Sequence, residues 1–142
     1  MDSIMLRRHL LLIALASASL AACEQAPDAD DNTREQLVGT WLREIKEGGI
    51  KARRVLVLEQ SGKFHETTRI TDADGVDKLV TGQGDWLFDG RNFKRRYAHV
   101  DGGRIQFATF EVKFPSRTEF TGVDNIHKVE VTYRRVADGT QA

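Results

Sequence analysis

Turn-forming residues recur at intervals of about eight to twelve positions along most of this chain. The candidate turns are Gly48-Gly49, Ser61-Gly62, Asp74-Gly75, Asp89-Gly90, Asp101-Gly102-Gly103, Pro115-Ser116 and Asp124-Asn125. Segments of this length between turns rich in glycine, asparagine and aspartate are typical of short antiparallel strands. The spacing therefore predicts an all-β fold.

Eight strands are expected between these turns. They cover residues 40–46, 53–60, 63–71, 78–88, 91–98, 104–114, 117–122 and 127–136. The fifth strand shows most clearly that the two faces of a strand differ. Phe93, Arg95 and Tyr97 share one face, and Lys94 and Arg96 share the other. A strand of this kind has one face toward the core and one toward water.

In the sixth expected strand, the apolar residues occupy odd-numbered positions at first and even-numbered positions further along. Those before the change are Ile105 and Phe107, and those after it are Phe110, Val112 and Phe114. Because successive residues point to opposite faces, both groups can face the core only if an extra residue is inserted. We therefore expect a β-bulge near Ala108 or Thr109.

A chain segment of this size can bury the apolar faces of eight antiparallel strands as a closed up-and-down barrel or as a sandwich. Closure removes strand edges that would otherwise pair with other chains. We therefore expect an eight-stranded antiparallel barrel that is monomeric. The pattern Thr33-Arg34-Glu35-Gln36, which fits a capping box, predicts one short helical turn before it.

The amino-terminal segment has a basic start, an apolar run and small residues before the only cysteine. Arg7 and Arg8 precede the apolar run 10–18, which leads into Leu20-Ala21-Ala22-Cys23. Because a membrane-spanning helix needs about 20 apolar residues, this run indicates a targeting segment. It resembles a bacterial lipoprotein signal peptide, residues 1–22, with its lipobox. The alternative is an ordinary secretory signal that happens to end near Cys23.

The resemblance to lipoproteins implies that Cys23 carries a diacylglyceryl group and that its new amino terminus is acylated with a fatty acid such as palmitate. Acyl chains of this kind give durable attachment to a membrane. Glu24 is not the aspartate that retains many lipoproteins in the inner membrane, so the resemblance implies the periplasmic face of the outer membrane. Residues 24–32 are acidic and lack large apolar side chains, which predicts a flexible tether between Cys23 and a domain at 33–142.

Several function classes find little support in the predicted domain. It has no cysteine, which excludes thiol redox chemistry and cysteine-based zinc sites, and its small excess of basic residues does not indicate nucleic-acid binding. His65, His99 and His127 lie in different strands or loops, so no metal is predicted, although a three-histidine site remains an alternative. Ser61 and Ser116 lie in turns, where hydroxyl groups bond to the local backbone. We expect no enzymatic activity and no cofactor.

Two tryptophan motifs resemble a known group of barrels. Leu37-Val38-Gly39-Thr40-Trp41 resembles the Gly-x-Trp opening of lipocalins and of bacterial lipocalin-like small barrels, and Gly82-Gln83-Gly84-Asp85-Trp86 resembles their mid-barrel hairpin. The resemblance implies that Trp41 plugs one end of the barrel. It also implies that a basic residue late in the last strand, Arg134 or Arg135, lies across the Trp41 ring.

Arg95 is the strongest candidate for a functional side chain, because its neighbours Phe93 and Tyr97 should point into the barrel. A buried guanidinium must be paired. Its partner is either an inward carboxylate, Glu66 or Glu111, in a structural ion pair, or a bound ligand. The Arg-x-Tyr spacing resembles the carboxylate clamp of intracellular fatty-acid-binding barrels, where it lies on the last strand.

Two functions follow as hypotheses. In the first, the barrel binds a small apolar or amphipathic ligand through Arg95, Tyr97 and Tyr133. In the second, it is an inhibitor-type or immunity-type lipoprotein that binds another periplasmic protein through loops such as 70–77 and 99–104. An eight-stranded barrel is just wide enough for its side chains, and the chain is rich in aromatic residues, so we expect a small or absent cavity.

Overall fold

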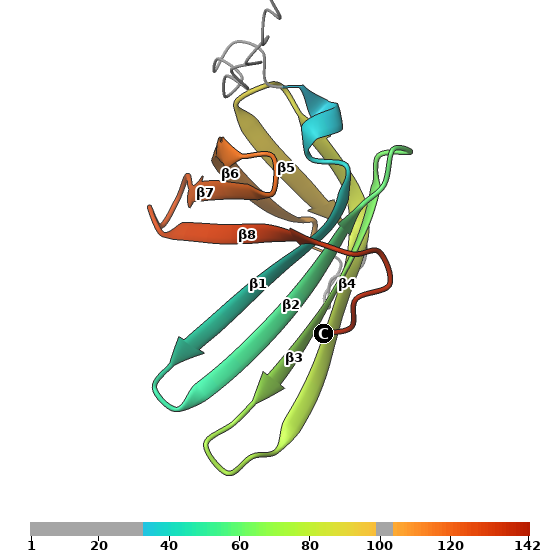
Figure 1. Cartoon of the computed structure of the whole chain (residues 1–142). Coiled ribbons are helices and arrows are strands. Elements are labelled where there is room, and N and C mark those ends of the chain that lie inside the picture. Colours follow the sequence, from blue (N-terminus) through green and yellow to red (C-terminus); the bar gives the residue numbers. More distant parts are fainter. Residues whose placement is uncertain (1–32, 99–103) are drawn as a thin grey trace, which may run out of the picture.

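The computed structural model describes residues 33–98 and 104–142, which form eight antiparallel strands closed into a barrel. Each strand pairs with the next along the chain, and the last pairs with the first (Figure 1). The strands are β1 (Gly39–Glu47), β2 (Ile50–Leu58), β3 (Lys63–Thr71), β4 (Asp77–Phe88), β5 (Asn92–Tyr97), β6 (Gln106–Ser116), β7 (Glu119–Asp124) and β8 (Glu130–Val136). The predicted all-β up-and-down barrel is confirmed.

The predicted helical turn is also present, as a 3-10 turn at Arg34–Gln36 (η2). The Gln36 side chain accepts a hydrogen bond from the Thr33 backbone N–H at 3.1 Å. Among the residues that the structure describes, no helix is long and apolar enough to span a membrane. The predicted signal peptide, Cys23 and the tether lie outside the described residues.

One end of the barrel is filled by aromatic and aliphatic side chains around Trp41, whose side chain is fully buried. The Trp41 ring meets Phe120 edge-on with 4.7 Å between the ring centroids, and Phe120 stacks on Tyr133 at 4.9 Å. Such aromatic pairs stabilise a core beyond their burial alone. This sealed end is therefore the hydrophobic core.

The predicted β-bulge near Ala108 or Thr109 is wrong. The pairing of β5 with β6 runs without interruption from Asn92 opposite Glu111 to Tyr97 opposite Gln106. Phe107 faces outward and is 50% exposed, so it never needed to share the core face with Phe110. The irregularity in β6 lies further along, between Lys113 and Ser116, where the register against β7 shifts.

Closure is limited to one end of the barrel. β8 pairs only with residues Thr40 to Leu42 of the nine-residue strand β1, and β5 pairs only with residues Gly84 to Phe88 of β4. The remaining halves of β1 to β4 stay paired with one another and project beyond the other four strands (Figure 1). We call this part, residues 43–54 and 67–83, the projecting sheet.

Candidate functional site

A buried ion pair lies inside the barrel, next to the aromatic core. Arg95 of β5 is 2% exposed and pairs with the Glu66 carboxylate of β3. The other carboxylate oxygen of Glu66 accepts a hydrogen bond from the Tyr97 hydroxyl at 2.8 Å. Glu111, the alternative partner, instead lies 3.2 Å from Arg91. The structure thus brings Arg95 and Tyr97 together through Glu66.

The Arg95 guanidinium is surrounded by aromatic rings. Its central carbon lies 5.6 to 5.8 Å from the ring centroids of Phe64, Phe93, Tyr97 and Phe110. Ring faces attract cations, which offsets part of the cost of removing this charge from water. Burial is also the main reason why the pKa of Tyr97 is raised, and the neighbouring Glu66 carboxylate raises it further.

Glycine at position 82 makes room for this cluster. Gly82 of β4 lies opposite Glu66 in the pairing of β3 with β4. A Cβ atom on Gly82 would lie 2.9 Å from Cε1 of Tyr97 and 3.2 Å from Cγ of Glu66. Any larger residue would therefore push the Tyr97 ring away from the Glu66 carboxylate.

A second arginine, Arg54 of β2, extends the cluster toward the projecting sheet. Its Nε donates a hydrogen bond to the Thr68 hydroxyl at 2.9 Å. Burial, the largest influence, lowers the pKa of Arg54, but the nearby Tyr133 and Glu66 outweigh it and raise the pKa. No carboxylate in the described part of the chain forms an ion pair with Arg54.

Two buried hydrogen-bond donors of the cluster are unused. The Tyr133 hydroxyl and Nε of Arg95 are both inaccessible to solvent, and neither donates a hydrogen bond to the residues described. The Tyr133 oxygen does lie close enough to the Arg54 guanidinium for hydrogen bonding to contribute to the raised pKa of Arg54. Buried polar atoms in native proteins nearly always have a partner. We call Arg54, Glu66, Arg95, Tyr97 and Tyr133 the polar cluster.

The inner face of the projecting sheet continues from the polar cluster and carries apolar side chains together with the charged Arg43 and Lys78, which lie opposite Arg54 and Ile70. Ala52 lies opposite Ile45 on one side and Ile70 on the other, and alternation places all three on the same face as Arg54. Val80 of β4 shares this face and is 41% exposed. The polar cluster therefore lies between the filled apolar end and a partly exposed face that holds both apolar and charged side chains.

Arg135, and not Arg134, lies across the Trp41 ring. The Arg135 guanidinium carbon is 4.3 Å from the ring centroid, because residues 41 and 135 are directly opposite in the pairing of β1 with β8. Arg134 is on the other face of β8, and its closest carboxylate contact is Glu44 at 4.0 Å.

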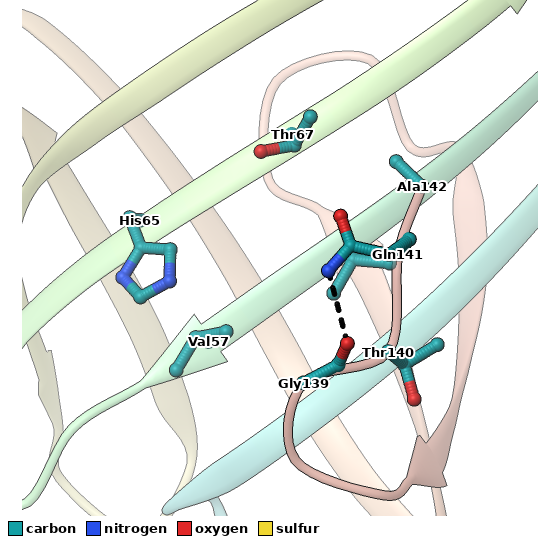
Figure 2. A pocket seen from close by; sticks show the side chains of 8 residues that line it. Val57, His65, Thr67, Gly139, Thr140, Gln141 and Ala142 are labelled. Atoms are coloured by element: carbon teal, nitrogen blue, oxygen red, sulfur yellow. Dashed lines mark hydrogen bonds between the residues drawn. The ribbon is translucent and has the colours of Figure 1, made fainter.

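A hollow of about 190 Å³ lies on the outside of the barrel, beneath residues 139–142 (Figure 2). These residues run back over β1 to β3 and are held by hydrogen bonds from Arg53 to the Gln141 carbonyl at 3.1 Å and from Arg69 to the Ala142 carbonyl at 3.0 Å. His65 lines the hollow together with the aliphatic side chains of Val55 and Val57, the Thr67 and Thr140 hydroxyl groups and the Gln141 amide.

The three candidate histidines are not brought together as far as the structure describes them. His65 lies in β3, His127 follows β7, and His99 lies outside the described residues. No group of three or more His, Cys, Asp or Glu side chains in residues 33–98 and 104–142 is arranged to hold a metal ion.

Comparisons with protein-family models, with curated proteins and with solved structures find no match to this chain. Its resemblance to lipoproteins and lipocalins thus rests on its own motifs.

Proposed function

We propose that this chain is a lipid-anchored, non-enzymatic lipoprotein of the periplasmic face of the outer membrane. Its lipocalin-like barrel binds a small amphipathic ligand, whose anionic end lies at the polar cluster and whose apolar part lies on the inner face of the projecting sheet. The anchoring half of this proposal is supported by the lipobox that ends at Cys23.

Ligand binding is supported above all by the unused donors of the polar cluster. The Tyr133 hydroxyl and Arg95 Nε can each donate a hydrogen bond, and neither does so within the described chain. Leaving a buried donor unsatisfied costs roughly 1–3 kcal/mol. A ligand oxygen that accepts these hydrogen bonds would recover that energy.

The charge of the cluster favours an anionic ligand group. Two guanidinium groups, on Arg54 and Arg95, face a single carboxylate, on Glu66. Glu66 forms its ion pair with Arg95 and also attracts Arg54, so among these three groups one positive charge is in excess. A carboxylate or phosphate oxygen would supply the missing charge and accept hydrogen bonds.

The position of the apolar surfaces favours a ligand with an apolar part. The Trp41 end is filled by side chains, so we place the ligand's entry on the other side of the cluster, at the projecting sheet. There Ile45, Ala52, Ile70 and Val80 offer an apolar surface next to Arg54. Burial of that surface contributes about 25 cal/mol per Å².

A titration with three twelve-carbon amphiphiles tests the proposed ligand class. Dodecanoate, dodecanol and dodecylammonium share one tail and differ in head-group charge. We expect dodecanoate to bind most tightly and dodecylammonium least, as measured by calorimetry below their micellar concentrations. Equal affinity for all three would show that the cluster does not recognise an anionic group.

Variants of Arg54 locate the site. Arg54→Met removes the unpaired charge but keeps an apolar stem, and we expect it to weaken dodecanoate binding about tenfold or more and dodecanol binding much less. Arg53→Met is the matched control, because Arg53 is the preceding residue of β2 and contacts Gln141 and Glu44 on the outer face.

A second candidate function is binding to another periplasmic protein through the loops. Exposed apolar side chains favour it: Val76, between β3 and β4, is 63% exposed, and Ile126, between β7 and β8, is 82% exposed. Val76→Asp and Ile126→Asp should abolish recovery of a stoichiometric partner from the native envelope. If no partner is recovered with the unaltered protein, this candidate is excluded.

A further inference from the structure

The second half of β1 has an edge without a partner strand. Beyond Leu42, residues 43–47 pair with β2 on one side and with no strand of the described chain on the other. Free strand edges present unpaired N–H and C=O groups to other chains. The structure thus leaves a short docking edge next to the point where β8 leaves β1.

The register shows which backbone groups are free. Glu47 lies opposite Ile50 across the two-residue turn Gly48-Gly49, which makes this a hydrogen-bonded pair. Along a strand, the backbone N–H and C=O groups of every second residue point to the same side. Those of residues 43, 45 and 47 therefore form hydrogen bonds with β2. The N–H and C=O groups of Glu44 and Lys46 therefore point out from the free edge.

The sequence of this edge is complementary to itself in one antiparallel register. If two copies pair with Ile45 opposite Ile45, Glu44 lies opposite Lys46 of the other copy, and Arg43 lies opposite Glu47. Opposite charges facing each other across strands stabilise a pair, and like charges destabilise it. A shift by one hydrogen-bonding step in either direction would instead place Glu44 opposite Glu44 or Lys46 opposite Lys46.

We propose that this edge is a self-association site. Two copies of the chain pair β1 with β1 in antiparallel fashion, about a two-fold axis at Ile45, and so join their projecting sheets into one sheet. Such an interface uses the same patch on both copies, as two-fold dimers do. It goes beyond the proposed ligand binding and does not depend on it.

The free backbone groups match this register. Glu44 bonds with Lys46 of the second copy through both backbone groups, and Lys46 does the same with Glu44, so every free group of the edge finds a partner. The pairing covers only five residues of each chain, so the interface is small and the association in dilute solution is weak.

Single cysteines placed in the edge test the register. Each is introduced into the full chain that also carries Cys23→Ser, purified in detergent, and is then oxidised mildly. In the proposed dimer the two residues at position 45 form a non-hydrogen-bonded pair with about 4.5 Å between Cα atoms. This distance lies within the range of roughly 4.4–6.8 Å that a disulfide can bridge. Ile45→Cys should therefore form a covalent dimer.

Glu47→Cys is the matched control, because its two copies lie four residues apart along the paired strands, about 13 Å. It should stay monomeric on a non-reducing gel. If Ile45→Cys forms no more dimer than Glu47→Cys, the proposal is wrong. Preferential cross-linking by Glu44→Cys, or to a different protein, would also overturn it.

A charge swap tests the same interface without a cysteine. Neither Arg43 nor Glu47 forms an ion pair within the described chain. Glu47→Arg places arginine opposite Arg43 at both ends of the interface, and we expect it to weaken dimerisation roughly tenfold in sedimentation equilibrium. The double variant Arg43→Glu/Glu47→Arg should restore it. If the double variant associates no better than the single one, or if the unaltered chain stays monomeric at all concentrations, the proposal fails.

Discussion

The guanidinium carbon of Arg135 lies 4.3 Å from the centroid of the Trp41 ring. The same side chain donates hydrogen bonds to the carbonyl oxygens of Gln36 at 2.8 Å and Val38 at 2.9 Å. The Trp41 indole in turn donates to the Leu37 carbonyl at 2.8 Å. Arg135 and Trp41 therefore connect the last strand to the first strand and to the helical turn at the sealed end.

Replacing Arg135 should destabilise the barrel. Arg135→Ala removes a cation–ring contact, worth about 0.5–2 kcal/mol, together with charge-assisted hydrogen bonds to the backbone. We expect the free energy of unfolding in urea to fall by about 2–3 kcal/mol. Arg134→Ala is the control and should change it by less than about 0.5 kcal/mol, because Arg134 is exposed. If the two substitutions lower the free energy of unfolding equally, the contacts of Arg135 do not stabilise the barrel as expected.

Adding a methyl group at Gly82 should disturb the polar cluster. The new Cβ atom would lie 2.9 Å from the Tyr97 ring, which would have to move away from Glu66. Overpacking of this kind costs about 1–3 kcal/mol, so Gly82→Ala should lower the midpoint of thermal unfolding. Thr81→Ala, next to it on the outer face, should have a smaller effect. A Gly82→Ala variant as stable as the unaltered protein would show that the cluster is loosely packed.

Stability should decline at alkaline pH because of Tyr97. Burial, aided by Glu66, raises the pKa of the Tyr97 phenol in the folded protein above its value in the unfolded chain, which is about 10. The folded state then holds the proton more tightly, so the stabilisation is fully present below about pH 10 and is lost as the pH rises above that value. Tyr97→Phe should reduce this alkaline decline in urea unfolding measured from pH 8 to 11. An unchanged slope would rule out Tyr97 as its source.

Metabolic labelling with palmitate tests the anchor. Since Cys23 is the only cysteine, label should appear in the envelope form of the protein and be lost in Cys23→Ser. Ser19→Ala, a nearby change that keeps the lipobox, should retain the label. Export without labelling would identify an ordinary secretory signal instead.

The architecture was predictable because turn residues such as Gly48-Gly49, Ser61-Gly62 and Asp74-Gly75 lie between short strands. The turn expected at Pro115-Ser116 instead follows β6, at residues 117–118. The Glu66 partner of Arg95 was among the alternatives because burial forces a carboxylate onto a guanidinium. The burial of Trp41 at one end was expected from the resemblance of Gly39-Thr40-Trp41 to the lipocalin opening, and not from local chemistry. The turns and the partner of Arg95 depend on local chemistry or on a buried charge, which a single sequence displays.

The inward position of Arg54 and the inward set of residues in β6 were not predictable, because in both strands apolar side chains also lie on the outer face. Val55 is 5% exposed although it points outward, because residues 139–142 lie over the outer face of β2. Both faces of that strand are thus apolar, and the alternation that would place Arg54 inside is hidden. In β6, Phe107 is apolar but exposed. Its place in the sequence therefore gives the same pattern as a change of register, which is why a β-bulge was expected. The sequence also gives no sign that β1 pairs with β8 over only three residues.

Native mass spectrometry of the protein purified from its own host tests the proposed ligand site most directly. The account predicts that the chain carries a bound small acidic amphiphile, that Arg54→Met loses it, and that Arg53→Met retains it. A chain that carries no such molecule, or one whose bound molecule is unaffected by Arg54→Met, would contradict the assignment of the polar cluster as a ligand site.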